Sequence, residues 1–182
     1  MDNSNMQNNE KFVLWLLGPT SSGKTTIANH FKNVLKDEEV PVIHYDGDEV
    51  RNFFGSDLGF SKLERLKVVK TLVHLSNKAT EAGLNVVVSA LTANPDARDY
   101  VIKNVKNLIV GYLQCSIEVC MQRDPKGLYR KAQRGDIDTL IGFNNIYMAP
   151  KNPDIVLDTE RCSPAMIVVE VKRFICQLGY LI

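Results

Sequence analysis

No stretch of the 182-residue chain is apolar over the ~20 consecutive residues that a helix needs to cross a bilayer. An excess of charge of either sign is missing too, because 22 Lys and Arg stand against 21 Asp and Glu, for a formal net charge of +1. A near-neutral chain has no broad field to attract a nucleic-acid polymer or an anionic membrane. We therefore expect neither as a partner.

Cysteine is scarce, and its spacing excludes two further classes of protein. The four cysteines never form a C-x-x-C pair, so we expect reduced thiols rather than a disulfide framework or a metal site. The polar N-terminus contains no apolar signal region, which predicts a disordered tail over 1–10. These features together predict a cytoplasmic protein.

The most informative segment, residues 18–26, reads Gly-Pro-Thr-Ser-Ser-Gly-Lys-Thr-Thr and contains the G-x-x-x-x-G-K-[ST] phosphate-binding pattern. It follows an apolar run typical of a buried strand and precedes a helical apolar pattern, which is the setting that the motif needs. Gly18 and Gly23 allow successive backbone N–H groups to face one anion, and the following helix adds partial positive charge. The chain is therefore predicted to bind a nucleoside triphosphate.

Lys24 and Thr25 give this loop its chemistry. A lysine at this position reaches the β- and γ-phosphates, and the hydroxyl of the next residue is placed to ligate Mg²⁺, the expected cofactor beside ATP. We expect the ATP phosphates to contact Gly18, Ser21, Ser22, Gly23, Lys24, Thr25 and Thr26.

Strand-like and helical segments alternate along the chain. β-rich apolar runs occur at Phe12–Leu17, Pro41–Tyr45, Leu84–Ser89, Leu108–Gln114 and Ile155–Leu157, and the clearest helical patterns cover Lys24–Lys36, Lys62–Ala82 and Pro164–Leu178. Such alternation predicts βαβ units on a parallel sheet. We therefore predict a single α/β domain over 11–182, with a three-layer P-loop fold.

Residues 123–150 differ from the rest of the chain, being charged and glycine-containing without a strand period. The segment is too long for a plain connection, so we predict a mobile lid with a short helix at Leu128–Arg134. Lys126 lies in its Pro-Lys-Gly turn and could neutralise charge on a phosphoryl group in transit. A solvated basic surface is the simpler alternative.

Asp46, Asp48 and Arg51 follow the second predicted strand, at the sheet edge where the phosphate loop also lies. Two carboxylates beside a triphosphate suit Mg²⁺ binding and deprotonation of an acceptor hydroxyl. Arg51 would lie on the same side of a helix as Asp48 and could hold an anionic acceptor. In the alternative, Asp48 only caps a helix and pairs with Arg51 at the surface.

From about residue 12 to 160, these motifs resemble the adenylyl-sulfate kinases in order and spacing. The resemblance rests on the phosphate loop, Asp46-Gly47-Asp48-x-x-Arg51, Leu58-Gly59-Phe60-Ser61, Arg65, Asp124-Pro125-Lys126-Gly127-Leu128-Tyr129, and Ala149-Pro150 before Asn152-Pro153. It implies a phosphotransferase with an alcohol acceptor, which moves the ATP γ-phosphate to the ribose 3′-hydroxyl of a small nucleotide.

The resemblance also implies roles for individual residues. The implied catalytic residues are Lys24, Asp46, Asp48 and Lys126, with Thr25 and Asp46 on Mg²⁺ and Arg123 against the ATP adenine. The implied acceptor contacts are Asp48, Arg51, Phe60, Arg65, Val68, Leu91, Thr92, Lys126 and Leu140. Relatives commonly form homodimers, for which Val69, Leu72 and Leu75 offer an apolar stripe, although such a stripe is more often core. Retention of the catalytic set argues against a domain that binds nucleotide without turnover.

The chain departs from the family pattern on the acceptor side. Val68 stands where the family has an Asn, and Leu140 replaces a Phe that stacks on the acceptor adenine. In the segment Ala90–Pro95, which corresponds to the family's F-I-S-P-x-R, Ala93 stands in place of the proline and Pro95 in place of the basic residue. Stacking of a base on an aromatic ring is worth ~1–3 kcal/mol. The favoured interpretation is a changed acceptor, such as cytidine diphosphoramidate in capsule phosphoramidate biosynthesis. The alternative is a genuine adenylyl-sulfate kinase that makes 3′-phosphoadenylyl sulfate.

Overall fold

A computed structural model of the protein describes residues 10–55 and 58–181. It contains one five-stranded sheet in the order β2-β3-β1-β4-β5, and every neighbouring pair in it is parallel. The strands are β1 (Val13–Leu17), β2 (Val42–Asp46), β3 (Asn85–Ser89), β4 (Leu108–Gln114) and β5 (Ile155–Asp158). All five match a predicted segment to within one residue at each end. Of the predicted tail over 1–10, residues 1–9 lie outside the described residues.

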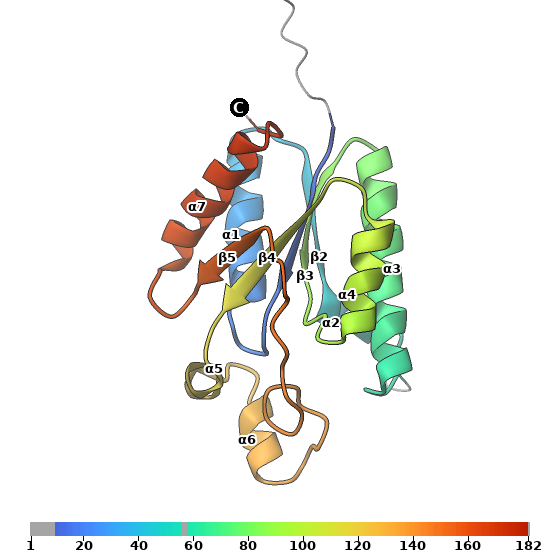
Figure 1. Ribbon diagram of the computed structural model, residues 1–182, viewed down its shortest axis with the longest axis vertical. Coiled ribbons are helices and arrows are strands. Elements are labelled where there is room, and N and C mark those ends of the chain that lie inside the picture. The colour runs from blue at the N-terminus through green and yellow to red at the C-terminus, as the bar shows by residue number, and fades with distance from the viewer. Residues whose placement is uncertain (1–9, 56–57, 182) are drawn as a thin grey trace, which may run out of the picture.

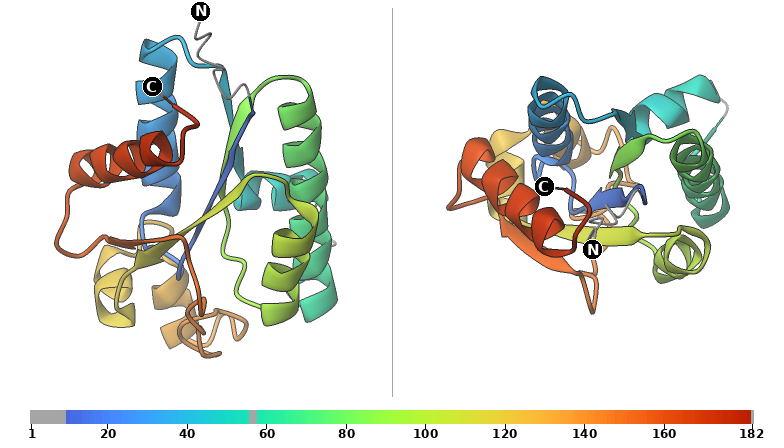
Figure 2. Two further views of the ribbon diagram at one scale, coloured as in Figure 1. Left: turned by 45° about the horizontal axis from the view of Figure 1, so that its top comes forward. Right: turned by 90° about the horizontal axis from the view of Figure 1, so that it is seen from above.

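Helices cover both faces of the sheet, so the α/β P-loop architecture predicted from the sequence is confirmed (Figure 1). One face carries α1 (Lys24–Asp37) and α7 (Pro164–Gln177), and the other carries α3 (Lys62–Glu81) and α4 (Pro95–Asn104) (Figure 2). Three short helices, α2 (Gly47–Phe53), α5 (Ile117–Arg123) and α6 (Leu128–Gln133), lie near the carboxyl ends of the strands. None of the helices in the described part of the chain is long and apolar enough to span a membrane.

Two hydrophobic clusters form because side chains of a strand alternate between the faces of the sheet. Leu14 and Leu16 of β1 pack towards α1 and α7, whereas Val13, Trp15 and Leu17 pack towards α3 and α4. Burial on both faces explains why β1 reads as a continuous apolar run. A central strand buried in this way fixes the phosphate loop that follows it.

Two of the three residues in the predicted apolar stripe on α3 belong to the core, and the third, Leu75, is half-buried. Val69 and Leu72 are 5% and 0% exposed in the cluster beneath α3, so the structure does not support them as a homodimer interface. The helix starts at Ser61, whose hydroxyl accepts from the backbone of Glu64 while the Glu64 carboxylate accepts from the backbone of Ser61. This capping box fixes the start of α3 close to Phe60 and Arg65.

The segment predicted as a lid, 123–150, lies at the carboxyl edge of the sheet with α6 inside it, as predicted (Figure 1). Tyr129, Ala132 and Leu140 of this segment form a small hydrophobic cluster with Cys115, which follows β4, and Cys120 of α5. The mobility of the segment stays a prediction. Its position places it over the cavity into which β1, β2 and β3 all lead.

Candidate active site

One large cavity of about 1430 Å³ runs along the carboxyl edge of the sheet. Its walls come from the phosphate loop, α2, the start of α3, the segment after β3, the lid and the start of α7. This volume exceeds the 300–1,000 Å³ usual for the pocket of one small ligand, so it suits two substrates side by side.

The phosphate loop adopts the compact shape that its glycines predict. Gly23 has a φ of 96° just before α1, a left-handed value that favours glycine. A Cβ atom on Gly18 would lie 2.8 Å from the backbone oxygen of Leu113 on β4, so only glycine fits there. Ser22 is fully buried, and its hydroxyl has no hydrogen-bond partner among the described residues. The buried hydroxyl is thus free for a ligand in the loop.

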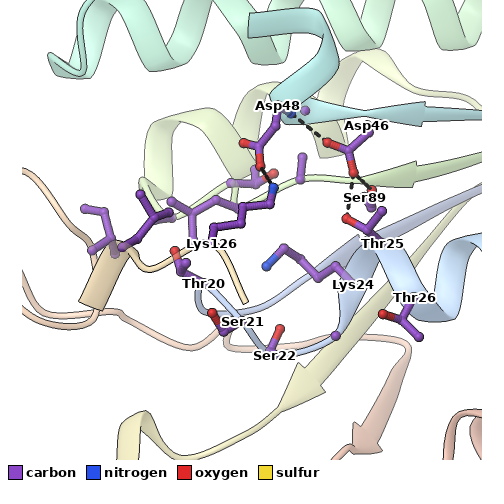
Figure 3. A pocket seen from close by; sticks show the side chains of 18 of the residues that line it. Thr20, Ser21, Ser22, Lys24, Thr25, Thr26, Asp46, Asp48, Ser89 and Lys126 are labelled. Carbon is purple, nitrogen blue, oxygen red and sulfur yellow. Dashed lines mark hydrogen bonds and ion pairs between the residues drawn. The ribbon is translucent and has the colours of Figure 1, made fainter. Parts of the chain in front are cut away.

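Lys24 folds back over its own loop. Its ammonium donates to the backbone oxygens of Gly18 at 3.0 Å and Pro19 at 2.7 Å. Burial lowers the Lys24 pKa to about 8, although the carboxylates of Asp48 and Asp46 act in the opposite direction. The side chain lies between the loop and these two aspartates (Figure 3).

Asp46 is the most heavily hydrogen-bonded carboxylate of the site. It accepts from the Thr25 hydroxyl at 2.7 Å, from the Ser89 hydroxyl at 2.7 Å and from the Asp48 backbone N–H at 2.8 Å (Figure 3). Burial favours the neutral acid, but these hydrogen bonds outweigh burial and hold the pKa of Asp46 below its usual value. Asp46 is therefore an anion beside the phosphate loop.

Asp46, the last residue of β2, caps the N-terminus of α2, because its side chain accepts a hydrogen bond from the backbone N–H of Asp48. The alternative in which Asp48 serves only as the cap is therefore wrong. The Asp48 carboxylate points into the cavity instead and lies 2.5 Å from the Lys126 ammonium of the lid (Figure 3). This hydrogen bond raises the pKa of Lys126. Both side chains are more than half exposed, so the pair contributes little to stability.

Arg51, Phe60 and Arg65 form a second wall of the cavity. The Phe60 side chain is 51% exposed, and the guanidinium carbons of Arg51 and Arg65 lie 4.6 and 5.3 Å from the centre of its ring. Arg51 donates to the Gly59 oxygen at 2.6 Å, and Arg65 donates to the Thr139 oxygen of the lid at 2.9 Å. An exposed ring between two cations offers stacking and charge to a planar anionic ligand.

The remaining predicted acceptor residues line the same cavity but are mostly buried. Val68 and Leu140 are 6% and 7% exposed, and Leu140 packs within the small cluster of the lid. Thr92 accepts a hydrogen bond from the Trp15 indole at 3.0 Å. Leu91 is half-buried beside Thr92. These side chains shape the wall and leave Phe60 as the one aromatic group lining the cavity among the described residues.

Arg123 and Thr159 mark the far end of the cavity, next to the start of α7. Arg123 donates to the Thr159 backbone oxygen at 2.5 Å and lies 3.5 Å from its hydroxyl. Residues 159–164 and Ile167 also line this end of the cavity.

The sequence analysis did not identify Ser89 or Tyr129, nor the hydrogen bond between His44 and Ser89. Ser89 pairs with Asp46 in the parallel register of β2 and β3, and His44 lies two residues before Asp46 on the same face. The Tyr129 hydroxyl donates to the Thr20 oxygen of the phosphate loop at 3.1 Å. Knowledge that β2 pairs with β3 would have placed Ser89 beside Asp46, but no local pattern in the sequence predicts that pairing.

A divalent cation would be held jointly by protein and triphosphate. The described residues contain no group of three or more His, Cys, Asp and Glu side chains placed to hold a metal. Thr25 and Asp46 supply one hydroxyl and one carboxylate, 2.7 Å apart, beside the phosphate loop. Mg²⁺ prefers such a set, because it keeps several waters and takes one or two carboxylates together with substrate phosphates.

Comparisons with known proteins identify the family to which the chain is similar. The family model of adenylylsulphate kinase matches residues 10–158. The probable adenylyl-sulfate kinase of Archaeoglobus fulgidus is 38% identical over 150 residues, which cover 82% of this chain and 97% of that protein. The adenylyl-sulfate kinase of Oceanobacillus iheyensis is 34% identical over 89% of this chain and 82% of its own. A structure of the Mycobacterium tuberculosis APS kinase CysC in complex with AMPPNP and APS superimposes with a TM-score of 0.86 at 28% identity, covering 91% of this chain and 98% of that one.

Proposed function

The chain belongs to the adenylylsulphate kinase family, and from this premise we propose that it transfers the γ-phosphate of ATP to the ribose 3′-hydroxyl of adenylyl sulfate. As a family member it is an ATP-dependent phosphotransferase with an alcohol acceptor. The observation that carries the choice of reaction is the single cavity that joins the phosphate loop, the Asp48–Lys126 pair and the Arg51–Phe60–Arg65 wall.

On the donor side, the loop N–H groups and the start of α1 bind the triphosphate. Lys24 releases the oxygens of Gly18 and Pro19 and moves its charge to the β- and γ-phosphates. Thr25 and Asp46 would hold Mg²⁺ together with the phosphates, and the ion would supply positive charge beside them. Arg123 and residues 159–164 bind the adenine.

At the acceptor, Asp48 is the general base. The 3′-hydroxyl oxygen bonds to the γ-phosphorus while its proton passes to the Asp48 carboxylate, and the bond from the γ-phosphorus to the β,γ-bridging oxygen breaks to release ADP. Lys126 hydrogen-bonds Asp48 at 2.5 Å, so its ammonium lies where it can neutralise the phosphoryl group in transit. The lid at 123–150 closes over this step and excludes water.

The acceptor lies against Phe60, with its anionic groups on Arg51 and Arg65. Stacking on Phe60 is expected to contribute ~1–3 kcal/mol. Val68, Leu91, Thr92 and Leu140 enclose it by shape. The names of the relatives favour adenylyl sulfate over the changed acceptor that the substitutions suggest.

Cytidine diphosphoramidate remains the second candidate acceptor. The observation in its favour is that Leu140 is aliphatic and buried, so that Phe60 is the one ring that the described residues of the cavity wall offer to the base. A smaller base needs less stacking surface than adenine.

A coupled assay of ADP release with ATP and Mg²⁺ tests both acceptors at equal concentrations. A kcat/KM for adenylyl sulfate at least a hundredfold higher, about 2.7 kcal/mol of discrimination, supports the proposal. The reverse preference establishes the second candidate. Turnover of neither acceptor, in protein that still binds Mg²⁺ and ATP, would rule out both and leave the kinase class.

A further inference from the structure

We propose that His44 and Ser89 are positioning residues that hold the Asp46 carboxylate in its orientation for Mg²⁺ and ATP. The three side chains form a hydrogen-bonded chain, His44–Ser89–Asp46, on one face of the sheet. The inference rests on the proposed function only in assigning Mg²⁺ to Asp46. It makes no use of the acceptor.

The parallel register of β2 and β3 brings these residues together. His44 pairs with Val87 and Asp46 pairs with Ser89, so all of them lie on the face that packs against α1. Thr25 at the start of α1 reaches Asp46 from the helix side, and Ser89 reaches the same Asp46 oxygen from the neighbouring strand. The carboxylate is thus held from two elements.

The direction of the hydrogen bonds follows from counting protons. Ser89 has a single hydroxyl proton, and the Asp46 carboxylate, 2.7 Å away, has none to give. The Ser89 proton therefore lies on the bond to Asp46, and the Ser89 oxygen must accept from His44 Nε2, at 2.9 Å. This fixes His44 with its proton on Nε2.

The orientation of the Ser89 hydroxyl matters because Ser89 is 3% exposed and makes its hydrogen bonds to His44 and Asp46. Without the His44 N–H, the Ser89 oxygen loses the donor that fixes its rotation, so one of the three hydrogen bonds that orient Asp46 is held less firmly. Partners that orient a metal-binding group through a hydrogen bond commonly change metal affinity or activity by about 10–100-fold when they are removed. The simpler alternative is that Ser89 merely satisfies a half-buried histidine and has no influence on the site.

The test compares His44→Leu, which removes the donor, with His44→Gln, whose amide N–H can replace it, and with Ser89→Ala. His74→Leu is the matched control, because His74 is exposed on the outer side of α3, away from the cavity. Calorimetry measures ATP affinity with and without Mg²⁺ for every variant, and therefore needs no acceptor.

We expect His44→Leu and Ser89→Ala to weaken Mg²⁺-dependent ATP binding by about tenfold. Binding without Mg²⁺ should change less than twofold, and His44→Gln should recover most of the loss. An unchanged Mg²⁺ dependence in folded His44→Leu protein, or equal losses with and without Mg²⁺, would overturn the proposal.

¹⁵N NMR of the histidine side chains gives an independent readout on the unmodified protein. The proposal requires the neutral His44 ring to carry its proton on Nε2, and a ring protonated on Nδ1 alone contradicts it even if the variants fail to fold. If instead these tests succeed and neither acceptor is phosphorylated, the positioning chain stands and only the proposed acceptor fails.

Discussion

The donor and acceptor sides of the cavity are built in different ways. The donor side consists of a loop between a fully buried strand and a 14-residue helix, and its groups are largely backbone N–H groups. The acceptor side consists of side chains, some exposed like Phe60 and others buried like Val68 and Leu140, and of contacts from the body to the lid, such as Arg65 with Thr139. Backbone geometry tolerates little change, whereas a wall made of side chains can change one residue at a time.

This difference explains where the chain departs from its family. The phosphate loop is complete, while the unusual residues, Val68, Leu91 and Leu140, all lie on the acceptor wall. A substitution at Gly18 would push a Cβ atom against the backbone of β4. A substitution in the acceptor wall only alters which small molecule fits.

Asp48→Asn should cause the largest effect, because it removes the base while leaving both binding sides in place. We expect kcat to fall by about 10²–10⁴-fold with little change in ATP affinity, since general base catalysis is typically worth that much. Single-turnover kinetics measure the rate of phosphoryl transfer, and calorimetry measures the affinity for ATP. Asp99→Asn, on the exposed surface of α4, serves as the control. Unchanged turnover in Asp48→Asn would exclude Asp48 as the base.

Phe60→Ala should separate the two sides most cleanly. Loss of stacking is expected to cost ~1–3 kcal/mol, which raises the acceptor KM by about 5- to 150-fold. The KM for ATP should stay within twofold, because no contact of Phe60 reaches the phosphate loop among the described residues. Leu63→Ala, at an exposed position on α3, is the control. An equal rise in the KM for the acceptor and in the KM for ATP would show that binding on the acceptor side affects binding on the donor side.

The pH dependence of ATP binding should isolate the donor side. Burial lowers the Lys24 pKa to about 8 in the free protein, and phosphates beside the ammonium must raise it again. Above pH 8 the free lysine is increasingly neutral, so binding takes up a proton and affinity falls, by about tenfold for each pH unit. Calorimetry in buffers of different ionisation enthalpy measures this proton. An ATP affinity that stays constant from pH 7.5 to 9.5, with no proton uptake, would contradict the lowered pKa of Lys24.

Tyr129→Phe should have the smallest effect and tests whether lid and loop act together. It removes the hydrogen bond from the lid to the Thr20 oxygen, worth about 0.5–1.5 kcal/mol, and keeps the buried ring. We expect a slightly lower Tm and a rise of a few-fold in the KM for ATP. Tyr100→Phe on α4, outside the cavity, is the control. A changed acceptor KM alone would assign Tyr129 to the acceptor side.

Local patterns predicted much of the fold because they depend on neighbours in the chain. The five strands and the helices α1, α3 and α7 follow from apolar periodicity and from caps such as Ser163 before Pro164. Helix α4 was missed because only Ala97 and Val101 of it are buried, which leaves almost no apolar pattern. Helix α5 is only seven residues long, too short for its period to be recognised.

The phosphate loop, its glycines and the aspartates after β2 were determined by the sequence itself, because each depends on residues within one strand–loop–helix unit. Only the tertiary structure decided that Asp48 meets Lys126 across 78 positions and that Leu140 is buried in the lid. It also decided the contact of His44 and Ser89, 45 positions apart. The physical reason is that strand pairing and lid position are set by burial across the whole molecule, which no local pattern encodes.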